Sequence, residues 1–208
     1  MKGKTALTAV FFDVGETLVD EERWWRELCE RAGLQPHVVW AALGVTIERG
    51  EEHDALWGHL GIDRPDGWWH GLSYELTDLY QEAIPCLEAM RKLGLRVGIV
   101  GNQAEALERW ARESALPADV ISSSASLGVR KPDPRFFAEV VRLAEAEEPA
   151  QVVYVGDRVD NDVVPARATG LAAVHVRRGP WGRLQRAPEG VPVIDSLEEL
   201  PRTLASLV

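Results

Sequence analysis

Short runs of apolar residues alternate along the chain with longer stretches in which apolar residues recur every three or four positions. The short runs end in turn-forming residues, as buried strands do, and the longer stretches have the period of amphipathic helices. Each helical stretch lies between two strands, as crossover connections in a parallel sheet require. The pattern therefore predicts an α/β fold built on a doubly wound parallel sheet.

The same pattern gives expected positions for the individual elements. Strands are expected at residues 7–12, 95–100, 120–121, 152–155 and 172–176, and helices at 85–93, 104–114, 134–146 and 162–168. A last apolar patch at 191–194 offers an edge strand before a terminal helix at 197–206.

One long segment, residues 20–83, has no convincing strand pattern and only helical periodicity broken by Gly and Pro. We expect a core domain of residues 1–19 and 84–208 and a helical insertion of residues 20–83. The insertion begins just after the first strand, at the carboxyl end of the sheet, where ligands of open α/β sheets bind. This position favours a lid over the functional site.

The insertion is rich in tryptophan, with six of the eight in the chain. Several of them must fill the centre of so small a helical unit, because little else in it is large enough. A more specific hypothesis is that the pair Trp68 and Trp69 lines a pocket for part of a substrate.

Charge and cysteine content narrow the classes of partner. The formal net charge is −10, and no cluster of Lys or Arg stands out, which argues against a nucleic-acid or anionic-membrane partner and favours a small molecule. The two cysteines fit no metal-ligand spacing and suggest no disulfide framework, so a cytoplasmic location is expected. The sequence leaves the oligomeric state open.

Acidic residues recur where predicted strands end. Asp13 closes the first strand, and Asp157 follows the fourth, with Asp160 and Asp162 close behind. If those strands are neighbours, the carboxylates of Asp13 and Asp157 lie side by side, and a hard cation such as Mg²⁺ is needed to offset their repulsion. The alternative is that each Asp merely caps the helix that follows it, which explains two such residues at neighbouring strand ends poorly.

Four short motifs occur in a fixed order along the chain. They are Asp13-Val-Gly-Glu-Thr17, the strand end Gly101-Asn102, Lys131-Pro-Asp-Pro134 and Gly156-Asp-Arg-Val-Asp-Asn-Asp162. In this order, over about residues 7–182, the sequence resembles the haloacid dehalogenase-like (HAD) hydrolases. The resemblance implies a Rossmann-like core with a small helical cap inserted after the first strand.

The resemblance also implies roles for individual residues. Asp13 would attack the substrate phosphorus and form an aspartyl-phosphate, and Lys131 would neutralise the charge of Asp13 and of the phosphoryl group. Mg²⁺ would be bound by Asp13, Asp157 and the Gly15 carbonyl, while Asp162 would order a water ligand of the ion. For Lys131, the plainer alternative is an exposed surface lysine.

Three further residues would lie at the phosphoryl group. Thr17 follows Asp13 within the first motif, although it could simply stabilise the turn. Gly101 and Asn102 end the second strand, and the backbone N–H of Asn102 could hold a phosphoryl oxygen.

The sequence departs from the family pattern at two of these positions. Gly15 stands where the family usually has a second Asp, the general acid, and Gly101 stands where it usually has Ser or Thr. Glu16 or Asp20 could replace the acid, although Glu16 also fits a solvated turn residue and Asp20 a helix cap. On this interpretation, Gly15→Asp would restore the proton donor.

These features favour a Mg²⁺-dependent hydrolase, a phosphatase of a small phosphorylated metabolite. The two glycines motivate an alternative, a HAD-fold binding or regulatory protein with weakened catalysis. A third hypothesis is metal-independent hydrolysis of a carbon–halogen bond by Asp13, against which the carboxylates of Asp157 and Asp162 argue.

Overall fold

The centre of the protein is a six-stranded sheet in which every pairing is parallel. The computed structural model describes residues 6–66 and 73–207. The strands run in the order β3-β2-β1-β4-β5-β6. Their bounds are β1 (Ala9–Phe12), β2 (Arg96–Gly101), β3 (Val120–Ser123), β4 (Val152–Gly156), β5 (Ala172–Val176) and β6 (Val193–Ile194). The predicted parallel sheet, including its edge strand, is confirmed.

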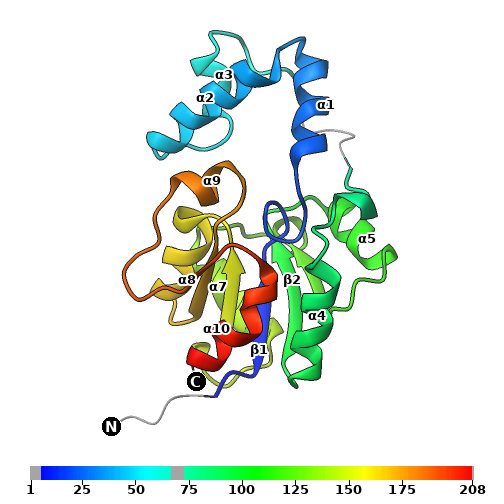
Figure 1. Ribbon diagram of the computed structural model, residues 1–208, viewed down its shortest axis with the longest axis vertical. Coiled ribbons are helices and arrows are strands. Elements are labelled where there is room, and N and C mark those ends of the chain that lie inside the picture. Colours follow the sequence, from blue (N-terminus) through cyan, green and yellow to red (C-terminus); the bar gives the residue numbers. More distant parts are fainter. Residues whose placement is uncertain (1–5, 67–72, 208) are drawn as a thin grey trace.

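Helices cover both faces of this sheet, because alternate strand residues point to opposite sides (Figure 1). Val10 and Phe12 of β1 belong to one buried cluster, and Ala9 and Phe11 belong to the other. The first cluster takes side chains from α4 (Ala83–Lys92), α5 (Glu105–Glu113) and α10 (Leu200–Leu207), and the second from α7 (Pro134–Leu143) and α8 (Val164–Ala168). The doubly wound fold is thus confirmed.

Some short elements were not predicted. These are α6 (Ser124–Leu127), α9 (Gly179–Leu184) and one-turn 3₁₀ segments at Leu76–Asp78 and Pro149–Gln151. The terminal helix expected at 197–206 begins with a 3₁₀ turn at Leu197–Glu199 and continues as α10. The helix expected at 162–168 begins earlier, as a π-helical turn over Val159–Val163 that continues into α8. Elements of one or two turns contain too few residues to show a period, so tertiary contacts decide them.

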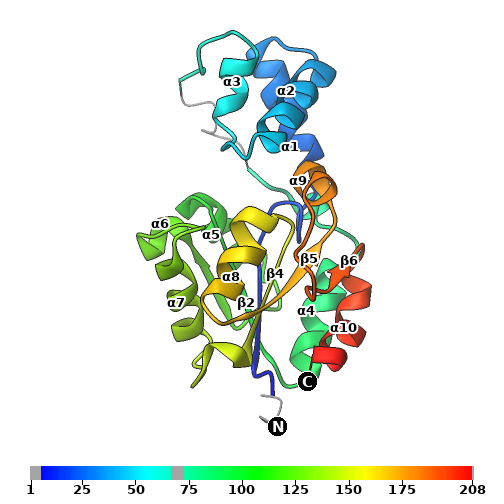
Figure 2. The same ribbon diagram turned by 90° about the vertical axis from the view of Figure 1, so that its left-hand side faces the viewer.

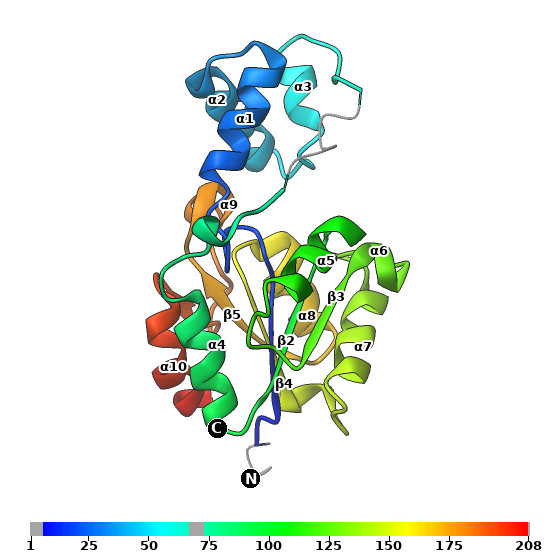
Figure 3. The ribbon, with the colours of Figure 1, turned by 90° about the vertical axis from the view of Figure 1, so that its right-hand side faces the viewer.

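The described part of the insertion carries the α-helices α1 (Glu22–Ala32), α2 (Pro36–Glu48) and α3 (Ala55–His59). Figures 1, 2 and 3 show them beyond the carboxyl ends of the strands, with α9 of the core beneath them. The two connections to the core pair with each other: the Asp20 N–H donates to the Asp78 carbonyl and the Tyr80 N–H to the Leu18 carbonyl. The division into two domains at residues 20 and 83 stays a prediction.

Tryptophans fill the centre of the insertion, as expected. Trp24, Trp25 and Trp57 are buried, and the ring of Trp25 packs against those of Trp24 and Trp40 at centroid distances of 5.4 and 5.6 Å. Trp68 and Trp69, proposed from the sequence to line a pocket, lie outside the described residues.

Among the helices of residues 6–66 and 73–207, none has the length and apolar character that crossing a bilayer requires.

Candidate active site

Three carboxylates meet where β1 and β4 end. β1 pairs with β4 in a register that places Phe12 beside Val155, so Asp13 and Asp157 follow neighbouring strands side by side. Asp162 reaches the same point from the π-helical turn, and one oxygen of each of the three carboxylates lies within 4.8 Å of the others. This is the arrangement predicted from the sequence for Asp13 and Asp157.

The carboxylate cluster has the chemistry of a cation site. All three side chains are buried, and burial, followed by the charges of Asp162 and Asp13, raises the pKa of Asp157 well above its usual value. Burial likewise raises the pKa of Asp162, although Lys131 opposes the change. Two ligands on opposite sides of one Mg²⁺ are about 4.2 Å apart, so carboxylate oxygens all within 4.8 Å of one another have separations of the size that one ion spans.

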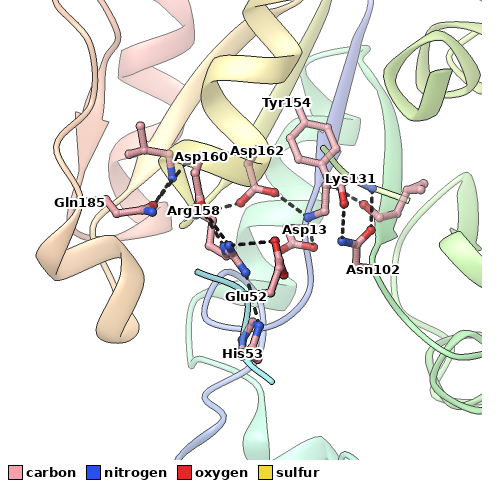
Figure 4. Close-up of polar contacts among 12 residues, drawn as sticks. Asp13, Glu52, His53, Asn102, Lys131, Tyr154, Arg158, Asp160, Asp162 and Gln185 are labelled. Carbon is pink, nitrogen blue, oxygen red and sulfur yellow. Dashed lines mark hydrogen bonds and ion pairs between the residues drawn. The ribbon is translucent and has the colours of Figure 1, made fainter. Parts of the chain in front are cut away.

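Lys131 supplies a positive charge to the cluster. Its Nζ lies 2.7 Å from Asp13 Oδ1 and 2.5 Å from Asp162 Oδ1, and 5.4 Å from the centre of the Tyr154 ring (Figure 4). Burial opposes its charge, but Asp13 and Asp162 outweigh burial and raise the Lys131 pKa well above its usual value. With 2% of its surface exposed, Lys131 is not the surface lysine of the plainer alternative.

Asn102 holds the main chain of Lys131 from both sides. The Lys131 N–H donates to Asn102 Oδ1 at 2.8 Å, and Asn102 Nδ2 donates to the Lys131 carbonyl at 3.0 Å. The sequence suggested a role only for the backbone N–H of Asn102, and that role stays a prediction. Its side chain therefore has a positioning role that sequence reasoning missed.

Protein donors engage both oxygens of Asp162. Oδ1 faces Lys131, and Oδ2 accepts the backbone N–H of Arg158 at 2.9 Å. A Cβ at Gly156 would lie 2.3 Å from Asp162 Oδ2, so glycine there leaves room for this carboxylate. The carbonyl of Asp157 is in turn 2.9 Å from His175 Nε2 on β5. Because both of its oxygens accept hydrogen bonds from the protein, the Asp162 carboxylate is held in one orientation.

Both unexpected glycines lie where side chains from elsewhere fill the space. A Cβ at Gly101 would lie 2.3 Å from Asp13 Oδ1. A Cβ at Gly15 would lie 2.3 Å from Oε1 of Glu21, although the backbone of Gly15 is not in the left-handed region. An Asp at position 15 would therefore enter space that the end of the Glu21 side chain already fills, and the expectation that Gly15→Asp restores a donor stays a prediction.

The residues considered as replacement acids have other surroundings. Glu16 is buried rather than solvated, it accepts the Tyr80 hydroxyl at 2.7 Å, and burial raises its pKa to about 7. Asp20 precedes the N-cap of α1, and its Oδ1 accepts the Glu22 N–H at 2.8 Å. Thr17 is fully buried in the turn after Asp13.

Sequence reasoning missed Glu21. It is half-buried at the start of α1, and its carboxyl accepts a hydrogen bond from the Tyr74 hydroxyl. Burial, and then the charge of Glu16, raises the pKa of Glu21 to about 8. The only signal in the sequence was indirect, namely the absence of a side chain at Gly15.

The insertion touches the core beside the carboxylate cluster. The ring of His53 lies 4.2 Å from that of Trp181 on α9 and 6.1 Å from that of Trp25 on α1. The guanidinium carbon of Arg158 lies 4.8 Å from the centre of the Trp181 ring. Its Nη1 lies 3.4 Å from His53 Nδ1 and its Nη2 lies 3.7 Å from Glu52 (Figure 4). Among the tryptophans of the insertion that the structure describes, Trp25 lies beside this contact with the core.

Comparison with known proteins agrees with the geometry. The family model for haloacid dehalogenase-like hydrolases matches residues 7–170. A glyceraldehyde 3-phosphate phosphatase of Methanopyrus kandleri is 29% identical over 93% of this chain and 82% of its own length.

Two solved structures share the fold. The HAD-hydrolase YfnB of Bacillus subtilis, solved with magnesium bound, has a TM-score of 0.68 at 19% identity over 96% of this chain and 99% of its own. An L-2-haloacid dehalogenase of Xanthobacter autotrophicus has a TM-score of 0.68 at 22% identity over 97% of this chain and 100% of its own.

Proposed function

This chain belongs to the haloacid dehalogenase-like hydrolases, and we propose that within the family it is a Mg²⁺-dependent phosphatase of a small phosphorylated metabolite. The observation that carries the proposal is the contact of Lys131 with Asp13 inside a cluster of three buried carboxylates. The similarity to a glyceraldehyde 3-phosphate phosphatase supports a phosphate ester as the substrate.

In the proposed reaction, Asp13 is the nucleophile. One of its carboxylate oxygens forms a bond to phosphorus as the bond from phosphorus to the leaving oxygen breaks, which gives an aspartyl-phosphate. Water then attacks the phosphorus, the bond to Asp13 breaks, and inorganic phosphate leaves. Lys131, 2.7 Å from Asp13, offsets the negative charge that gathers on the transferring group.

The metal would be bound by Asp13, Asp157 and the carbonyl of Gly15. The bound ion would neutralise charge on the phosphoryl oxygens and orient the group for in-line attack. Asp162, with both oxygens held by Lys131 and Arg158, would order the outer shell of ligands.

The decisive experiment is a screen of phosphorylated metabolites for phosphate release, in Mg²⁺ and in EDTA. We expect release in Mg²⁺ that EDTA abolishes and added Mg²⁺ restores. Chloride release from 2-chloro acids in EDTA would instead indicate carbon–halogen hydrolysis. Tight binding of a metabolite with neither product would indicate a binding protein.

The metal should also change how stability depends on pH. The pKa values of Asp157 and Asp162 are raised in the folded protein, so without metal the folded state binds more protons than the unfolded state. The free energy of unfolding then falls as the pH rises from about 4, the unfolded pKa, through the folded values. Mg²⁺ favours the ionised carboxylates, so thermal melts should show a larger Mg²⁺-induced rise in Tm at pH 8 than at pH 5.5.

The control for this measurement is Asp157→Asn. That variant keeps the shape of the side chain but removes one ionisable ligand, so both the Mg²⁺-induced rise in Tm and its growth with pH should shrink. Equal Mg²⁺ effects at the two pH values in the wild-type protein would contradict the assignment of the cluster as the metal site.

We further propose that residues 20–83 act as a cap that closes over the site through the contact of His53 with Trp181. His53→Ala removes the ring that lies between Trp25 and Trp181 and one partner of Arg158. We expect faster amide hydrogen exchange in α9 and around residue 53, unchanged exchange in β1 and β4, and a raised KM.

His59→Ala, which removes a partner of Glu51 within the insertion, is the matched control. Unchanged exchange in α9 would contradict docking through His53.

A further inference from the structure

The strongest unassigned feature of the site is the carboxyl of Glu21. We infer that Glu21 is the proton donor and acceptor of the reaction, reaching from the first helix of the insertion into the space that a side chain at position 15 would occupy. This inference rests on the proposed phosphatase function.

The backbone around Gly15 brings Glu21 to this place. The N–H groups of Leu18 and Val19 both donate to the Val14 carbonyl, and the Glu16 N–H donates to the Val19 carbonyl. This tight turn sends the chain back past Gly15 into α1, whose N-terminal cap is Glu21. The turn thus fixes Glu21 beside the segment that carries the nucleophile.

The carboxyl group itself fills the position next to Gly15. A Cβ on Gly15 would lie 2.3 Å from Glu21 Oε1 and 2.7 Å from Glu21 Cδ, which are distances of overlap. Gly15 is two residues from Asp13, and the charge of Asp13 acts on the Glu21 carboxyl. A proton-transferring group at this place can therefore serve the leaving oxygen of a phosphate ester whose phosphorus faces Asp13. A carboxyl from another part of the chain therefore occupies the place where a general acid can work.

A second residue orients this carboxyl. The Tyr74 hydroxyl donates to Glu21, and Tyr74 is itself buried and packs edge-on against Trp110 of α5, with ring centroids 5.6 Å apart. Glu21 and Tyr74 belong to the outgoing and returning connections of the insertion. The insertion, rather than the core motif after β1, thus supplies the acid.

The proton transfers balance over the two steps. In the first, Glu21 in its acid form gives its proton to the leaving oxygen as the bond from phosphorus to that oxygen breaks and the Asp13–phosphorus bond forms. In the second, the Glu21 carboxylate takes a proton from the attacking water as the new oxygen–phosphorus bond forms and Asp13 is released. Glu21 ends the cycle protonated, as it began.

The test is Glu21→Gln, which keeps the size of the side chain and an acceptor for Tyr74. An aryl oxide leaves with little help from a proton donor, whereas an alkoxide needs to be protonated as it leaves. We therefore expect kcat/KM to fall about 10²- to 10⁴-fold on glycerol 1-phosphate and far less on p-nitrophenyl phosphate. With the aryl ester, the missing base should slow the second step, so a burst of about one p-nitrophenolate per enzyme should precede a slow steady rate.

Two further variants make the result specific. Glu16→Gln alters a neighbouring buried carboxyl, and any loss it causes should be equal on the two esters. Gly15→Asp combined with Glu21→Ala moves the carboxyl to position 15 and frees the space that it needs. The kcat/KM of this double variant on glycerol 1-phosphate should therefore be higher than that of Glu21→Ala alone. The double variant also tests the inference if Glu21→Gln fails to fold.

Equal losses on both esters, or no loss, in a folded Glu21→Gln protein would overturn the role of Glu21 and leave the phosphatase function standing. The absence of phosphate release from the wild-type protein would overturn the phosphatase function, and the role of Glu21 with it.

Discussion

Asp13→Asn is expected to lower phosphate release by about 10⁶-fold, the size of loss that follows removal of a nucleophile in other hydrolases. An amide oxygen is a poor nucleophile, so the aspartyl-phosphate should not form even though the side chain keeps its shape. Steady-state rates on p-nitrophenyl phosphate, with the wild-type protein as reference, measure the effect.

The fold should survive this change. Lys131 keeps Asp162 at 2.5 Å, and the crowded cluster loses one of its three negative charges. The Tm of Asp13→Asn in EDTA at pH 8 should therefore be no lower than that of the wild-type protein. The matched control is Asp160→Asn, a nearby carboxylate that pairs with Arg158 outside the cluster and should leave the rate within about tenfold. Rates of Asp13→Asn close to those of Asp160→Asn would rule out Asp13 as the nucleophile.

Lys131→Met should cost both stability and activity. It removes the cation that contacts Asp13 and Asp162, and breaking a buried ion pair from one side typically costs about 3–5 kcal/mol. Loss of the positive charge at the phosphoryl group should slow turnover about 10²- to 10³-fold. Urea melts and phosphate-release rates measure the two effects separately.

The losses of stability and turnover should come from the position of Lys131 between two buried carboxylates, so removing an exposed lysine should not cause them. Lys92→Met is the control, since Lys92 is exposed and lies 4.0 Å from Glu88, and its removal should change stability by less than about 0.5 kcal/mol. Adding Asp162→Asn to Lys131→Met should recover part of the lost stability, because the unpaired carboxylate is then neutral. Equal melts for the two Met variants would contradict a charged Lys131 inside the cluster.

The sequence was sufficient for the sheet and for the meeting of Asp13 with Asp157 because these features depend on local patterns. Buried parallel strands such as β4 are short apolar runs that end in turn residues, and that pattern needs no knowledge of contacts. The prediction that Asp13 and Asp157 lie together needed only one further step, the adjacency of their strands. Lys131 was found through its motif, although its burial between two carboxylates was not visible in the chain.

Side chains brought in from other elements could not be read in the same way. The turn at residues 14–19 sends Glu21 back over Gly15, so two positions six apart in the sequence share one space. Asn102 and Lys131 meet because they come after two neighbouring strands, β2 and β3. His53 meets Arg158 because the insertion docks on α9. Each of these contacts depends on the packing of distant segments.

The sequence by itself determined the parallel α/β core, the helical character of the insertion and the positions of the carboxylates, because hydrophobic period and strand-end residues are properties of consecutive positions. Only the tertiary structure decided why position 15 is a glycine and which carboxyl stands beside it. The physical reason is steric exclusion, since two groups cannot occupy one volume, and a sequence does not state which distant side chain fills the space that a glycine leaves.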